Sequence, residues 1–70
     1  MAHTTNAGTT FVIYRHLTAS GPEYRWRLRD TDGRTLARSA TGHRERSDME
    51  REMRPVVEAH PGASVLDPAG

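Results

Sequence analysis

The sequence predicts an α+β fold of the order β-β-β-α-β, in which one helix packs on one face of an antiparallel three-stranded meander. Two observations predict it. Residues 24–29 alternate strictly between apolar and arginine side chains, as a strand with one buried face does. After Gly42 the apolar residues recur at helical spacing, at Met49, Met53, Val56 and Val57. A sheet followed by one helix forms two layers.

The chain has 70 residues and no cysteine, which bounds its organisation. It is long enough for one domain, predicted at residues 10–67, with disordered tails at residues 1–9 and 68–70. A chain of this size buries only ~60% of its unfolded surface, so its core is marginal. Without cysteine it has no disulfides or thiolate metal sites to add stability. We therefore expect it to associate with a second copy.

The first strand is predicted at residues 10–16, which are rich in β-branched and aromatic side chains. Phe11 and Ile13 would share one side, and Val12 and Tyr14 the other. Both sides are apolar, so the alternation does not choose which one faces the core.

Residues 17–22 contain glycine and proline and predict a loop, after which residues 23–30 predict the second strand. Three apolar side chains alternate there with three arginines. The apolar set, expected in the core, is Tyr24, Trp26 and Leu28. The arginine set, expected on the opposite face, is Arg25, Arg27 and Arg29.

The Asp32-Gly33 pair within residues 31–34 predicts a two-residue hairpin turn, followed by a third strand at residues 35–40. The helix is predicted to begin at a capping box formed by Ser47 and Glu50, or a turn earlier. Pro55 predicts a kink, because it removes one backbone hydrogen bond.

His60-Pro61-Gly62 predicts the end of the helix, and residues 63–67 predict a short last strand. This strand has no hairpin partner in sequence. It can cross to an edge of its own sheet or pair with another chain.

Two stretches, FVIYR and EYRWRLRDTDGRTLARS, resemble the YegP-like family of small domains of unknown function. The likeness covers roughly residues 10 to 66. The matching positions are Phe11, Ile13, Tyr14, Glu23, Tyr24, Arg25, Trp26, Arg27, Leu28, Gly33, Ala37 and Ser39. The chain departs from the family pattern at four places. These are the longer loop at residues 17–22, one extra residue between Ser39 and Gly42, His43 and Pro55. The resemblance implies a homodimer with a continuous sheet and exchanged C-terminal strands, and it implies no catalytic residues.

The three alternating arginines are the one candidate binding site. They would stand ~6.6 Å apart along the strand, close to the spacing of successive phosphates. Arginine stems also commonly cover the solvent side of a sheet, so a solvated or subunit-facing row is the favoured interpretation. The net charge of +1 argues against a dedicated nucleic-acid binder. Weak single-stranded nucleic-acid binding through Arg25, Arg27 and Arg29 is the alternative function.

No catalytic, cofactor or metal constellation is predicted. The four histidines lack metal-ligand spacing, and Asp30-Thr31-Asp32-Gly33 lacks the later ligands of a calcium loop. The polar start resembles no signal peptide and no run reaches membrane-spanning length, so we expect a cytoplasmic protein. The sequence thus predicts a homodimeric domain that is not an enzyme, has no cofactor, and has an interaction or accessory role.

Overall fold

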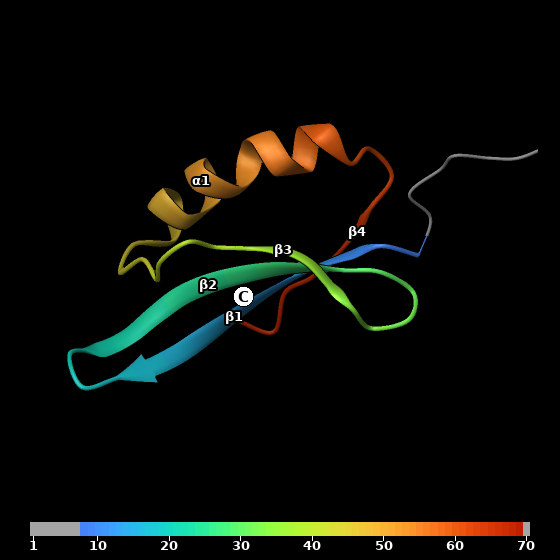
Figure 1. Ribbon diagram of the computed structural model, residues 1–70. Coiled ribbons are helices and arrows are strands. Elements are labelled where there is room, and N and C mark those ends of the chain that lie inside the picture. Colours follow the sequence, from blue (N-terminus) through green and yellow to red (C-terminus); the bar gives the residue numbers. More distant parts are fainter. Residues whose placement is uncertain (1–7, 70) are drawn as a thin grey trace, which may run out of the picture.

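The computed structural model describes residues 8–69, which form a four-stranded sheet with one helix lying across one of its faces (Figure 1). In chain order the elements are β1 (Thr10–Thr18), β2 (Gly21–Arg29), β3 (Thr35–Arg38), α1 (Arg46–Ala59) and β4 (Ser64–Leu66). The strands lie side by side in the order β3-β2-β1-β4. The predicted α+β class and element order are confirmed.

The first hairpin is longer than the sequence pattern suggests. β1 and β2 pair without interruption from Thr10 opposite Arg29 to Thr18 opposite Gly21, so the predicted loop at 17–22 is wrong in extent. The Thr18 hydroxyl donates to the Gly21 carbonyl at 2.7 Å and accepts from the Ser20 amide at 3.1 Å. Gly21 adopts a φ of +114°, which favours glycine. These features close a turn of two residues.

The second hairpin has a wider turn than the predicted two-residue one. The Gly33 amide donates to the Asp30 carbonyl and the Asp30 amide to the Arg34 carbonyl, both at 3.0 Å. Among the described residues no side-chain-bearing residue has a positive φ, whereas Gly33 has +86°. This pattern fits a three-residue loop with glycine in the left-handed position. The Asp30 carboxylate favours it by accepting from the amides of Asp32 and Arg34 at 2.9 and 3.0 Å.

Replacing Asp30 with alanine should lower the free energy of unfolding by about 1 kcal/mol, because two backbone amides lose their side-chain acceptor in a turn. Urea unfolding followed by circular dichroism measures this loss. Asp32→Ala, an exposed change in the same turn, is the control and should cost less. Equal effects of the two changes would contradict the role given to the Asp30 carboxylate.

The core lies between α1 and the face of the sheet that α1 covers. Its buried residues come from three elements and are Phe11, Ile13, Trp26, Leu28, Met49 and Met53. The predicted apolar face of β2 and the helical methionines are therefore confirmed. The structure also shows which side of β1 faces the core, namely the side of Phe11 and Ile13.

The helix begins at Arg46, with Glu45 as its N-cap and without a side-chain capping bond, so the predicted capping box is wrong. The physical reason is competition for Glu50. Its carboxylate accepts from Arg46 Nε at 2.9 Å instead of reaching back to Ser47. Pro55 lies inside the helix, which continues to Ala59.

β4 pairs in parallel with the first residues of β1, and the Ser64 amide donates to the Thr9 carbonyl at 3.0 Å. Within one chain, the last strand therefore crosses to an edge of its own sheet. Its exchange between two copies remains a prediction. Asp67 follows β4 and forms an ion pair with Arg46 at the start of the helix. Of the predicted tails, residues 1–7 and 70 lie outside the described part of the chain.

Candidate functional site

The face of the sheet opposite α1 is here called the open face. It comprises the even-numbered residues of β1, the odd-numbered residues of β2, Thr35 and Arg38 of β3, and Ser64 and Leu66 of β4. The three predicted arginines lie together on it, as expected. The strand register adds Arg38 opposite Arg27, and Tyr14 opposite Arg25. Arg38 was missed because its position depends on the bulge between β2 and β3.

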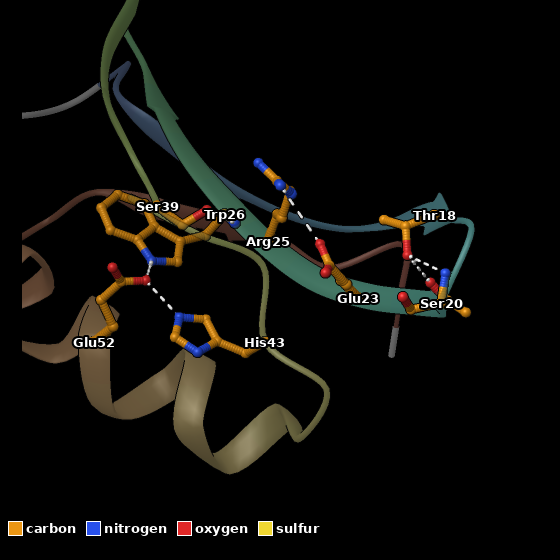
Figure 2. Close-up of polar contacts among 9 residues, drawn as sticks. Thr18, Ser20, Glu23, Arg25, Trp26, Ser39, His43 and Glu52 are labelled. Carbon is orange, nitrogen blue, oxygen red and sulfur yellow. Dashed lines mark hydrogen bonds and ion pairs between the residues drawn. The ribbon is translucent and has the colours of Figure 1, made fainter.

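Two arginines of the open face, Arg25 and Arg27, contact neighbouring side chains of the sheet. The guanidinium carbon of Arg27 is 5.2 Å from the centre of the Tyr14 ring, which is a cation–π contact. The Nε atoms of Arg25 and Arg27 are buried and have no hydrogen-bond partner among the described residues. Arg25 points away from the helix and its terminal nitrogen lies 3.4 Å from the Glu23 carboxylate (Figure 2). Arg25 and Arg27 are thus held by neighbouring side chains, and each has one nitrogen with no hydrogen-bond partner among the described residues.

Charge is unevenly distributed between this face and the rest of the chain. All charged side chains other than the histidines lie within residues 8–69. The open face carries four of the ten arginines and one of the nine acids, a formal charge of +3. The remaining six arginines and eight acids sum to −2. The open face is therefore cationic although the net charge of the whole chain is only +1.

A hollow of about 240 Å³ lies at one end of the open face. Its lining residues are Thr10, Val12, Arg29, Asp30, Thr31, Gly33 and Leu66. Val12 and Leu66 give it an apolar wall beside the Arg29 side chain. The Asp30 carboxylate in its rim is already engaged with two backbone amides of the turn.

A second polar cluster centres on Glu52 of α1 (Figure 2). One carboxylate oxygen of Glu52 accepts from Trp26 Nε1 at 3.2 Å and lies 2.8 Å from His43 Nε2. The other oxygen accepts from the Ala40 amide at 3.2 Å. Sequence reasoning missed this cluster, because its members come from β2, α1 and the segment between β3 and α1. Their spacing along the chain carries no motif.

The surroundings of Glu52 stabilise its charged form. Partial burial acts to raise the pKa of this carboxyl, but hydrogen bonds from His43, the Ala40 amide and Trp26 outweigh it, and the pKa is lowered. One oxygen accepts from Trp26 of β2 and the other from Ala40, which follows β3. The carboxylate therefore serves to fasten α1 to β2. Within residues 8–69 no group of three or more His, Cys, Asp and Glu side chains could hold a metal ion.

The edge of β1 offers a further surface. β4 covers Thr10–Val12, whereas residues 13–18 have β2 as their one strand neighbour among the described residues. We call residues 13–18 the free edge. A hollow of about 310 Å³ lies at its start, lined by Tyr14, Arg15, Pro68 and Ala69.

These features define a small two-layer α+β domain with a cationic sheet face and, among the described residues, a strand edge without a strand partner. The chain belongs to the YegP-like family, described as "Domain of unknown function (DUF1508)", whose model matches residues 19–67. The resemblance noted in the sequence is thereby confirmed. No curated protein and no solved structure matches the chain. The described residues contain no helix long and apolar enough to cross a membrane.

Proposed function

We propose that this protein is a cytoplasmic, non-enzymatic interaction domain that works as a homodimer. The observation that carries the proposal is the free edge of β1. An unpaired strand edge presents backbone donors and acceptors to another chain, and such edges pair readily. A second copy of the same chain is the partner that fits, because a domain this small gains core and sheet from association.

The backbone pattern shows which groups of the free edge would pair. The Thr9 carbonyl accepts from Ser64 of β4, so odd-numbered residues of β1 direct their amides and carbonyls to this side. The backbone amides and carbonyls of Arg15 and Leu17 therefore point outward at the free edge. The Leu17 side chain is also 78% exposed, which is unusual for a leucine and would be relieved by a partner strand. Two copies paired here would share one continuous sheet.

The exchange of C-terminal strands is compatible with the same dimer. In the exchanged form, residues 63–67 of the partner would take the place of β4 beside Thr10–Val12. The short length of β4, which has three residues, makes this replacement sterically simple.

The non-enzymatic role is supported by the use of the polar residues. His43 and Glu52 form the one ion pair between a histidine and a carboxylate within residues 8–69. Glu52 has hydrogen-bond partners on both of its carboxylate oxygens, in Trp26 and Ala40 as well as His43, which suits a structural link between helix and sheet rather than a general base.

Replacing Leu17 with proline tests the dimer. Proline removes one of the outward amides of the free edge, while Leu17 lies opposite Pro22 of β2, so the first hairpin is spared. At micromolar concentration, light scattering should give a dimer for the wild type and a monomer for Leu17→Pro. The control is Leu17→Thr, which retains the amide and should remain dimeric.

A strictly monomeric wild type would refute the homodimer. A dimer that survives Leu17→Pro but is lost on removal of residues 63–70 would show that strand exchange, and not the free edge, holds the copies together.

A further inference from the structure

The open face combines three properties that a surface of solvated arginines does not require. It concentrates positive charge, holds one guanidinium over an aromatic ring, and includes a hollow with an apolar wall.

The charge on the face is arranged in two directions. Along β2, Arg25, Arg27 and Arg29 are separated by ~6.6 Å, since alternate residues of a strand share a face. Across the sheet, Arg38 lies opposite Arg27 in the neighbouring strand, ~4.8 Å away along the hydrogen-bonding direction. Such an array suits a polymer that carries one negative charge per repeat and can follow the strand.

The placement of the Arg27 guanidinium distinguishes this face from a row of mobile cations. The guanidinium lies over the Tyr14 ring, and its Nε atom is buried without a hydrogen-bond partner in residues 8–69. A planar cation held against a ring offers its outer side for stacking. Unpaired nucleobases stack on arginine planes and aromatic rings, and this stacking tolerates any base.

The hollow beside Arg29 fits the same ligand. Val12 and Leu66 provide an apolar wall, and Leu66 is 58% exposed. A base entering this hollow would cover Leu66, while the arginine beside it would meet a phosphate. In a duplex the bases are stacked on one another, so a duplex could contact only the positive charges of the face and not the hollow.

We infer that the open face binds single-stranded nucleic acid, with Arg25, Arg27, Arg29 and Arg38 on the phosphates and the Arg27–Tyr14 pair under a base. The inference names a partner for the proposed interaction domain and does not depend on its being a dimer. Charge complementarity and the stacked pair favour a single strand over an acidic polypeptide, because a polypeptide of aspartate and glutamate has nothing to stack.

Fluorescence anisotropy of labelled twelve-nucleotide oligo-dT and oligo-U, titrated with the full chain at several salt concentrations, tests this inference. The triple variant Arg25→Ser/Arg27→Ser/Arg29→Ser should bind at least tenfold more weakly than the wild type at low salt. Its slope of log affinity against log salt should be shallower by about 2, since each phosphate contact to a single strand contributes about 0.7.

A matched control removes the same charge elsewhere. Arg44→Ser/Arg51→Ser/Arg54→Ser alters three arginines on α1 and just before it, away from the open face, and should change affinity by less than threefold. Tyr14→Leu keeps the apolar volume and all charges. It should weaken binding about fivefold or more while leaving the salt slope unchanged, because it removes stacking and no phosphate contact.

Folding of each variant is checked by its circular dichroism melting curve. If the triple serine variant does not fold, the corresponding triple lysine variant replaces it, and should bind more weakly with an unchanged salt slope.

Four results would overturn the inference. They are no binding by the wild type at low salt, equal losses in the two triple variants, no effect of Tyr14→Leu, and equally tight binding of a poly-glutamate peptide or a DNA duplex. A monomeric protein that binds the oligonucleotides would refute the homodimer and leave this inference standing.

Discussion

Replacing Trp26 with alanine is expected to lower the free energy of unfolding by about 3–5 kcal/mol. Trp26 lies in a central strand, is 2% exposed, and meets Phe11 with ring centres 6.1 Å apart. Removing it opens a cavity between β2 and α1. Domains have only ~0.05–0.15 kcal/mol of stability per residue, so a chain this short would lose most of its stability.

The measurement is urea unfolding followed by far-ultraviolet circular dichroism, because Trp26 is the one tryptophan and its fluorescence disappears with it. Trp26→Phe is the matched control. It keeps a ring in the core but loses the hydrogen bond from Nε1 to Glu52, so it should cost about 1–2 kcal/mol. An alanine variant within 1 kcal/mol of the wild type would show that the ring is not a core element.

Replacing Glu52 with alanine should cost about 2 kcal/mol, the second largest effect expected. The change leaves Trp26 Nε1 without its acceptor on a residue that is almost fully buried, and an unsatisfied buried donor is costly. The Ala40 amide also loses its acceptor, but it is exposed and water can replace the carboxylate. Glu50→Ala is the control, since Glu50 pairs with Arg46 on the exposed side of the same helix and such pairs contribute little. Equal losses in the two variants would contradict the fastening role of Glu52.

The same group predicts a pH dependence. The pKa of Glu52 is lowered in the folded protein from an ordinary value of 4.5, so its contribution is complete above that value and is lost as the pH falls through the lower folded value. Glu52→Gln cannot titrate and should lack this part of the loss. Melting temperatures of both proteins between pH 7 and pH 3 measure the difference, and parallel curves would contradict it.

The elements that the sequence predicts well are those in which one physical rule dominates. Only a half-buried strand places the alternating apolar and arginine side chains of residues 24–29 on two separate faces. Met49 and Met53 share one face only if the segment is a helix. The structure agrees on both. The sequence does not predict which side of β1 faces the core, because both of its sides are apolar. The packing of Phe11 against Trp26 shows which side it is.

The errors occur where a polar side chain competes for backbone or for another side chain. Thr18 closes a shorter turn than its glycine and proline neighbours suggest, and Asp30 holds a wider one. Arg46 draws Glu50 away from the predicted cap. Propensity rules assign such residues to turns and caps but do not say which donor each will choose.

The candidate site was predictable only in the part that lies on a single strand. Arg25, Arg27 and Arg29 lie on one strand, so their common face follows from period two. Arg38 and the Glu52 cluster depend on how separate elements align. That alignment is a property of the tertiary structure, and no local pattern contains it.

The parallel pairing of β4 with β1 has a consequence for the order of folding. The two hairpins bring neighbouring residues together and can form while later parts of the chain are still being synthesised. Thr10 can pair with Ser64 only after the helix between them has been synthesised. Closing so long a stretch of chain carries the largest entropic cost in the fold. The sheet is therefore completed last at the edge where β1 remains open to another chain.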